Sequence, residues 1–190
     1  MSVRLVSFIT GSKVWWRIIG RVHIVQHLFY ITGFMGSGKT TIGQAIGRKF
    51  NYQVVDIDQW IEEKEQRIIK DIFQTQGETY FRELETEALQ TISGDRLIVT
   101  TGGGIVVNEC NRQIMSEQGT VIYLKCEMEE LFRRLEGDTS RPNFHGHDKK
   151  QVEQLFHKRQ AYYEQADITI DTTNKSVIQI CNELKDVLNS

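Results

Sequence analysis

The segment of residues 33–40 reads GFMGSGKT and satisfies the pattern G-x-x-x-x-G-K-[ST]. It follows a short apolar run, Leu28–Thr32, that predicts a strand, and it precedes a helix-like stretch at residues 40–50. The glycines let successive backbone N–H groups face one anion, and a helix N-terminus adds about half a positive charge. A turn that merely connects a strand to a helix does not require Lys39 followed by Thr40, so we predict a phosphate-binding loop.

The loop predicts a nucleoside triphosphate as ligand. In this motif Lys39 would contact the β and γ phosphates, and the hydroxyl of Thr40 would hold Mg²⁺. The residues expected to contact ATP here are Gly36, Ser37, Gly38, Lys39, Thr40 and Thr41. The loop does not by itself select a reaction, because GTPases, ATPases and kinases of nucleotides or small molecules all use it.

The composition is that of one folded domain. The chain has 190 residues, of which 39% are hydrophobic and 25% are charged, so it can bury a core. A net charge of −2 argues against nucleic acid as a partner. The three cysteines show neither zinc-site nor disulfide-framework spacing, which favours a cytoplasmic location. We expect a monomer, since no additional apolar stripe is evident.

The start of the chain is basic: residues 1–55 carry seven Lys or Arg and no acid. No run reaches the roughly 18 apolar residues that a membrane-spanning helix needs, so we expect no membrane partner. We interpret residues 1–23 as an N-terminal extension, a tail or an extra amphipathic element, with an organellar targeting segment as the alternative. Residues 24–190 then form a single domain with a lid at about 137–149.

From Leu28 onward, apolar runs alternate with helical patterns. This alternation predicts a five-stranded parallel sheet with helices on both faces, a three-layer α/β sandwich that binds ligands at the carboxyl ends of its strands. The predicted strands are Leu28–Thr32, 52–57, Leu97–Thr100, 120–124 and Ile168–Asp171. The predicted helices are 40–50, 59–66, 67–73, 78–92, 110–117, 127–135, 150–165 and 176–188.

Two acids close the second apolar run. Residues i and i+2 of a strand point to the same side, so Asp56 and Asp58 would both face the phosphate loop. One would reach Mg²⁺ through water, and the other would orient a hydroxyl nucleophile and accept its proton. The alternative is a solvated strand end or a helix cap.

An anionic acceptor is indicated by arginines and a glycine turn. Arg82 has Glu85 at i+3, the spacing at which an acid can fix a guanidinium. Residues 102–104 are all glycine, so a ligand can approach their backbone. Three more arginines complete the predicted set: Arg134, Arg141 and Arg159. Taken singly, each arginine could equally be a solvated surface residue.

These residues together resemble the shikimate kinase family over roughly residues 28–188. The motifs that carry the resemblance are GFMGSGKTTIG, VVDIDQWIE, IIKDIFQTQGETYFRELE, TTGGG, RR-x₆-RP and R-x-x-x-Y followed by E-x-A. The resemblance implies a nucleoside-monophosphate-kinase type of P-loop fold with a mobile lid. It also implies transfer of the ATP γ-phosphate to the 3-hydroxyl of shikimate, on the pathway to aromatic amino acids.

The resemblance also implies roles for individual residues. On the ATP side these are the phosphate lysine Lys39, the Mg²⁺ residues Thr40 and Asp56 (through water), Arg134 near the adenine, and Arg141 in the lid. On the acceptor side, Asp58 is the base and also bonds the shikimate hydroxyls. Arg82 and Arg159 bind the carboxylate, and the backbone of Gly103 and Gly104 contacts the substrate. Glu85 corresponds to the acid that steadies Arg82.

The chain departs from the family pattern in two places. The lid usually continues Arg-Pro-Leu-Leu, whereas here Pro142 is followed by NFHGH, and about 20 residues at the start have no counterpart. Two alternatives stay open from the sequence. One is a small P-loop kinase acting on gluconate or a nucleotide, and the other is a nucleotide-binding regulatory protein that uses the basic start as an interaction arm.

Overall fold

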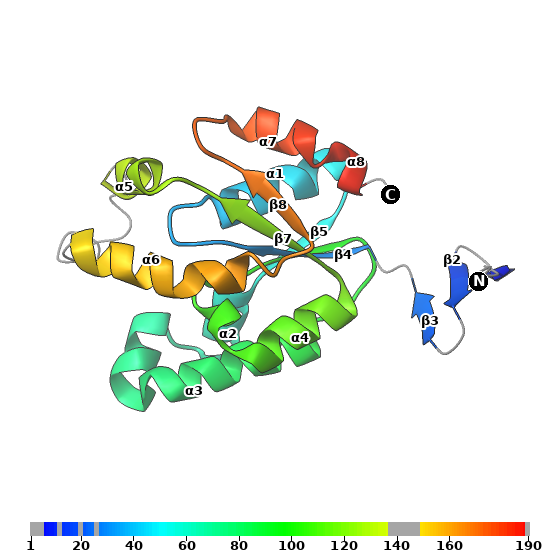
Figure 1. Cartoon of the computed structure of the whole chain (residues 1–190). Coiled ribbons are helices and arrows are strands. Elements are labelled where there is room, and N and C mark those ends of the chain that lie inside the picture. The colour runs from blue at the N-terminus through cyan, green and yellow to red at the C-terminus, as the bar shows by residue number, and fades with distance from the viewer. Residues whose placement is uncertain (1–5, 11–12, 19–20, 25–26, 137–148, 189–190) are drawn as a thin grey trace.

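A five-stranded parallel sheet forms the centre of the molecule (Figure 1). The computed structural model describes residues 6–10, 13–18, 21–24, 27–136 and 149–188. The strands lie in the order β5-β6-β4-β7-β8, and every neighbouring pair is parallel. The predicted three-layer α/β sandwich is therefore confirmed.

The elements alternate along the chain as the sequence predicted. The strands of the central sheet are β4 (Leu28–Thr32), β5 (Gln53–Asp56), β6 (Leu97–Thr100), β7 (Thr120–Lys125) and β8 (Ile168–Asp171). The helices are α1 (Lys39–Phe50), α2 (Ile57–Glu65), α3 (Ile69–Thr91), α4 (Glu109–Gln118), α5 (Met128–Glu136), α6 (Lys149–Tyr163), α7 (Val177–Glu183) and α8 (Lys185–Leu188), with the short 3-10 helix η1 (Ile105–Val107). Helices connect the parallel strands, because such strands need a crossover connection.

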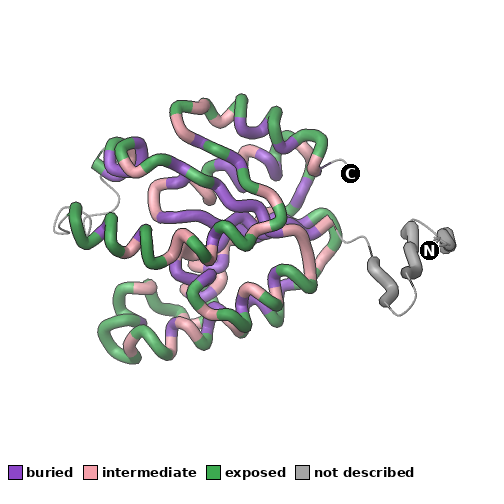
Figure 2. The backbone as a smooth tube through the Cα atoms, viewed as in Figure 1, coloured by how far each residue is buried: buried purple, intermediate pink, exposed green. Residues whose placement is uncertain are grey.

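Alternate residues of β4 belong to two hydrophobic cores, one on each face of the sheet. Phe29 and Ile31 pack in the core that includes α1, α7 and α8. Leu28 and Tyr30 belong to the core built with α2, α3, α4 and α6. Figure 2 shows the strands buried between helices whose outer sides are exposed. Both faces of the sheet are covered, so its carboxyl edge is where the candidate residues can meet a ligand.

The setting of Asp58 differs from the prediction. We expected residues 52–57 to form a strand from which Asp56 and Asp58 project together. Instead β5 ends at Asp56, whose carboxylate caps α2 by accepting the backbone N–H groups of Asp58 (3.0 Å) and Gln59 (3.3 Å). The strand placement of Asp58 was wrong, and this residue lies in the first turn of α2.

A bend at Gly77 divides α3 into two helical segments. Gly77 has φ 82° and ψ 175°, a conformation that is essentially restricted to glycine. The two segments correspond to the predicted helices at 67–73 and 78–92. The predicted helix at 176–188 is also divided, with Leu184 between α7 and α8.

Residues 6–24 contain three further strands, β1 (Val6–Thr10), β2 (Lys13–Ile18) and β3 (Arg21–Ile24). They form a separate antiparallel sheet in the order β1-β2-β3. We had expected a tail or an amphipathic element, but the β-branched and aromatic residues of these segments favour strands. Within the part of the chain that the structure describes, no helix combines the length and apolar character that crossing a membrane requires.

Candidate active site

The predicted phosphate-binding loop joins β4 to α1. Gly38 is the N-cap of α1 and has the left-handed values φ 93° and ψ 18°, which suit glycine. The backbone N–H of Ser37 donates to the carbonyl of Phe34 at 3.1 Å and closes the turn. Lys39 begins α1, and its Nζ donates to the Phe34 carbonyl at 3.0 Å. The loop thus places an ammonium group at the positive end of a helix, where phosphates bind.

Oxygen donors gather beside this loop. The hydroxyls of Thr40 and Thr100 both donate to Oδ2 of Asp56, at 3.0 and 2.7 Å. Hydroxyl and carboxylate oxygens are the ligands that Mg²⁺ prefers, and it usually keeps several waters. Among the described residues, no group of three or more His, Cys or acidic side chains is placed to hold a metal ion. The donor set fits Mg²⁺ completed by water and phosphate oxygens.

A hollow of about 690 Å³ lies over the phosphate loop. The sequence-predicted residues that line it are Gly36, Gly38, Lys39, Thr40, Thr41, Asp56, Asp58, Gly103 and Arg134. The structure therefore brings the loop, both acids and one arginine to a single cavity. Arg141 lies outside the described residues, as does most of the predicted lid.

Arg82 is held on α3 by two acids. Its Nη1 donates to Oε2 of Glu85 at 2.7 Å, and its Nη2 donates to Oε1 of Glu78 at 2.8 Å. A Cβ atom at Gly104 would come within 2.5 Å of both terminal nitrogens of Arg82, so the guanidinium lies directly against the glycine turn. The predicted Arg82–Glu85 pair is present.

Glu85 is completely buried beneath this guanidinium. Burial raises the pKa of Glu85 to about 7, although the positive charge of Arg82 acts in the opposite direction. Asp58 also raises it, and oxygens of Glu85 and Asp58 each lie 3.0 Å from the position that a Cβ atom at Gly102 would occupy. Arg82 and Asp58 are therefore close neighbours of one buried carboxyl group.

A second hollow, of about 740 Å³, is lined by Arg82 and Arg159 together with Lys158 and Tyr162. Arg159 Nη1 donates to the carbonyl of Gly103 at 3.3 Å. Gly103 lines the first hollow, and Arg159 of the second hollow donates to its carbonyl, so the glycine turn is in contact with residues of both hollows. The arrangement suits a small anionic molecule whose carboxylate meets the arginines while its other end faces Asp58 and the phosphate loop.

Arg134 on α5 lines the hollow over the phosphate loop. Its Nε donates to Oε1 of the buried Glu130 at 2.7 Å, and its Nη2 donates to the carbonyl of Thr172 at 2.7 Å. Its Nη1 is 3.5 Å from the carbonyl of Ser37. This guanidinium links α5, the end of β8 and the loop.

A family model described as shikimate kinase matches residues 35–189. The chain belongs to the shikimate kinase family. It is a kinase with ATP as its co-substrate, and its fold is that of P-loop kinases. The resemblance read from the sequence motifs is thereby confirmed.

Shikimate kinases of known sequence or structure match most of the chain. Shikimate kinase from Bacillus anthracis (strain CDC 684 / NRRL 3495) is 53% identical over 160 residues, which is 84% of this chain and 97% of that protein. The structure of shikimate kinase from Acinetobacter baumannii in complex with shikimate matches with a TM-score of 0.79 and 29% identity, covering 87% of this chain and 94% of that one. Deoxyadenosine kinase from M. mycoides, 16% identical with a TM-score of 0.59, shares the fold.

Sequence reasoning missed several residues that support this shikimate kinase site. Thr100 bonds Asp56, Glu130 holds Arg134, and the Tyr163 hydroxyl donates to the Gly103 carbonyl. Glu130 had a signal, because it stands four residues before Arg134, the spacing of a helical ion pair. Thr100 and Tyr163 lie in the quoted motifs TTGGG and R-x-x-x-Y, but nothing local indicated their partners, which are distant in the sequence and meet them only in the fold.

Proposed function

We propose that the protein transfers the γ-phosphate of ATP to the 3-hydroxyl of shikimate and releases shikimate 3-phosphate and ADP. The observation that carries this proposal is the glycine turn at residues 102–104, with Asp58 and the phosphate loop on one side and Arg82 and Arg159 on the other. A cyclic acid with hydroxyl groups matches this separation of cationic and carboxylate groups. Membership of the shikimate kinase family supports the same substrate.

On the nucleotide side, the backbone of the loop and Lys39 bind the β and γ phosphates. Thr40 and, through a water, Asp56 would hold Mg²⁺, and the 3.0 Å hydrogen bond between these two side chains supports this pairing. When bound, Mg²⁺ neutralises phosphate charge as the phosphoryl group departs. The family resemblance assigns Arg134 to the adenine, and it also assigns Arg141, which lies outside the described residues, to contact with ATP. Because phosphoryl transfer has a loose transition state, positioning and charge neutralisation supply most of the catalysis.

On the acceptor side, Arg82 and Arg159 bind the carboxylate, assisted by the backbone of Gly103 and Gly104. Asp58 receives hydrogen bonds from the shikimate hydroxyls and accepts the proton of the attacking one. Its position at the start of α2, beside the phosphate loop, supports that role. Glu85 keeps the Arg82 guanidinium in place through their 2.7 Å ion pair.

The whole catalytic unit lies within residues 24–190 in this proposal, acting as a cytoplasmic monomer, and residues 1–23 are an extension outside it. Removing residues 1–23 is therefore expected to leave the rate of shikimate phosphorylation within about twofold of the full chain. A larger loss would place part of the machinery in the extension. The sedimentation behaviour of the full chain tests whether the protein is a monomer in solution.

A coupled assay of ADP release tests the substrate. We expect release to depend on shikimate, and faster release with gluconate or AMP would overturn the assignment.

Lys39→Met should abolish turnover, whereas Lys49→Met, at the far end of α1, should not. Arg82→Ala should weaken shikimate binding by roughly 1.5–3 kcal/mol, the usual scale for a hydrogen bond to a charged group, with ATP affinity nearly unchanged. Equal losses for both ligands would show that Arg82 does not bind the acceptor.

A further inference from the structure

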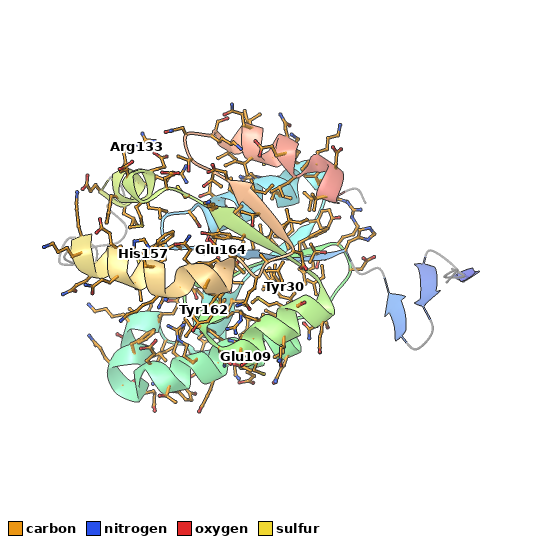
Figure 3. All side chains as sticks on the ribbon, in the orientation of Figure 1. Tyr30, Glu109, Arg133, His157, Tyr162 and Glu164 are labelled. Carbon is orange, nitrogen blue, oxygen red and sulfur yellow. The ribbon has the colours of Figure 1, made fainter. Side chains whose placement is uncertain are left out.

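Arg112 on α4 contacts three segments that surround the glycine turn. Its Nη1 donates to the carbonyls of Val106 at 2.7 Å and Val107 at 3.2 Å, and its Nε donates to Oε1 of Gln165 at 2.9 Å. Its guanidinium carbon lies 4.7 Å from the centroid of the Tyr162 ring. Figure 3 shows Tyr162 between α6 and α4. One side chain thus ties η1 to α6 and to the residues that follow α6.

The two segments joined by Arg112 carry the proposed carboxylate site. Helix η1 follows Gly104 without a break, and α6 carries Arg159. Arg159 and Tyr163 of α6 both donate to the carbonyl of Gly103. The spacing between the glycine turn and α6 therefore depends on bonds at the turn itself and on Arg112 behind it.

We propose that Arg112 is a positioning residue for the acceptor site, which sets the separation between the glycine turn and α6 and so the affinity for the acceptor's carboxylate. The proposal rests on the proposed function, in which Arg82 and Arg159 bind that carboxylate. Arg112 lines neither the hollow over the phosphate loop nor the one between Arg82 and Arg159, so its effect passes through the groups it holds. A guanidinium suits this task because its rigid planar fork can lie on a ring while its edges donate in fixed directions, whereas an ammonium is a compact charge whose donors rotate.

The chain offers a matched control in Arg96. This arginine also donates to two backbone carbonyls, of Phe50 and Asn51, and lies 4.5 Å from the centroid of the Tyr52 ring. It precedes β6 directly, at the amino end of that strand, whereas the site lies at the carboxyl end. Replacing Arg96 should thus cost comparable packing without disturbing the site.

The first experiment compares Arg112→Met, Arg112→Lys and Arg96→Met with the unmodified chain. We expect Arg112→Met to raise the KM for shikimate about tenfold, below the roughly 100-fold that a 1 Å misplacement can cost, with kcat and the KM for ATP within about twofold. The shikimate KM of Arg112→Lys should lie between those of the unmodified chain and of Arg112→Met. Arg96→Met should lower the melting temperature without changing either KM. An unchanged shikimate KM in Arg112→Met, or equal rises for shikimate and ATP, would overturn the proposal.

Gln165→Leu, at an exposed position, removes the bond from Arg112 to the segment after α6, together with the weaker bond from Gln165 Nε2 to the carbonyl of Ala161 (3.3 Å) within α6 and its end. It should also raise the shikimate KM. Once Arg112→Met is present, adding Gln165→Leu should raise the shikimate KM little further. Full additivity would show that the two residues act separately and would contradict the proposal, even where Arg112→Met folds poorly.

Amide hydrogen exchange of the protein without substrate gives a readout that does not depend on shikimate. Exchange across residues 103–107 should be faster in Arg112→Met than in Arg96→Met, with the first turn of α1 unchanged in both. Unchanged exchange in this segment would contradict the positioning role. Absence of shikimate-dependent ADP release by the unmodified chain would instead contradict the proposed function, so failure of one proposal can be distinguished from failure of the other.

Discussion

The guanidinium of Arg82 occupies the space that a side chain at Gly104 would need, within 2.5 Å of its Cβ position. The backbone of Gly104, with φ −98° and ψ −11°, is open to any residue. The glycine is thus required by the approach of Arg82, and an added methyl group tests that contact without straining the chain.

Gly104→Ala should displace the Arg82 guanidinium from the turn and weaken shikimate binding. We expect a loss of at least about tenfold, equivalent to about 1.4 kcal/mol, with ATP affinity unchanged. Titration of each ligand measures this. Gly94→Ala is the control, because a Cβ atom there would meet Leu97 only at an ordinary 3.6 Å. Unaltered shikimate affinity would mean that Arg82 moves aside freely and does not bind in this position.

Glu85→Gln should change how stability depends on pH. The folded-state pKa of Glu85, about 7, lies above the ordinary 4.5, so between these values the folded state binds more protons than the unfolded state. The contribution of Glu85 to the free energy of unfolding is present below about pH 4.5 and is lost as the pH rises through about 7. Urea unfolding should show that the variant lacks this decline.

The control for that measurement is Glu83→Gln, which changes an exposed acid on the same helix. Its stability should follow the pH dependence of the unmodified chain. If Glu85→Gln also keeps the same slope between about pH 4.5 and 7, the Glu85 carboxyl does not titrate in that range in the folded protein.

The sequence was most informative where one local pattern determines the structure. The strand Leu28–Thr32 and the loop after it were predicted correctly, because apolar content, glycines and a helix start follow one another directly. Asp58 was misplaced because alternation in a strand and the first turn of a helix both allow two acids two residues apart. The choice depended on the carboxylate of Asp56, which caps a helix instead of extending a strand.

Contacts between distant residues were beyond local patterns. The bond between Thr100 and Asp56 exists because β5 and β6 are neighbours in register, a fact set by strand order. The reach of Arg112 to Gln165 likewise depends on how α4 and α6 pack. The family resemblance named the acceptor residues and the acid Glu85 that steadies Arg82, but not the bond from Tyr163 to the carbonyl of Gly103.

Gly77→Ala should destabilise the protein through the backbone alone. Nothing lies within 4 Å of the position that the new methyl group would take, yet φ is 82°. Conformations of this kind cost of the order of 1–3 kcal/mol for other residues, and the free energy of unfolding in urea should fall by that amount. Gly94→Ala, where φ is not positive, should be nearly neutral. Equal stability of both variants would indicate that α3 straightens at little cost.

Glu130→Gln should loosen Arg134 and weaken ATP binding selectively. Hydrogen bonds from Arg133 and Arg134 lower the pKa of Glu130 to about 2, so the carboxylate stays charged at neutral pH. A neutral amide binds Arg134 less tightly. We therefore expect the KM for ATP to rise roughly three- to tenfold, the loss of a charge-assisted hydrogen bond, with the KM for shikimate unchanged.

The same substitution carries a second, independent signature. Because the folded pKa of Glu130 lies below the ordinary 4.5, its contribution to stability is present above about pH 4.5 and is lost as the pH falls towards 2. Glu130→Gln should be less stable than the unmodified chain at neutral pH, and the difference should shrink in acid. Glu129→Gln, at an exposed position beside it, should show neither effect. An unchanged KM for ATP in Glu130→Gln would show that Arg134 does not take part in nucleotide binding, and Glu130 would then only hold Arg134 in its structural link from α5 to Thr172.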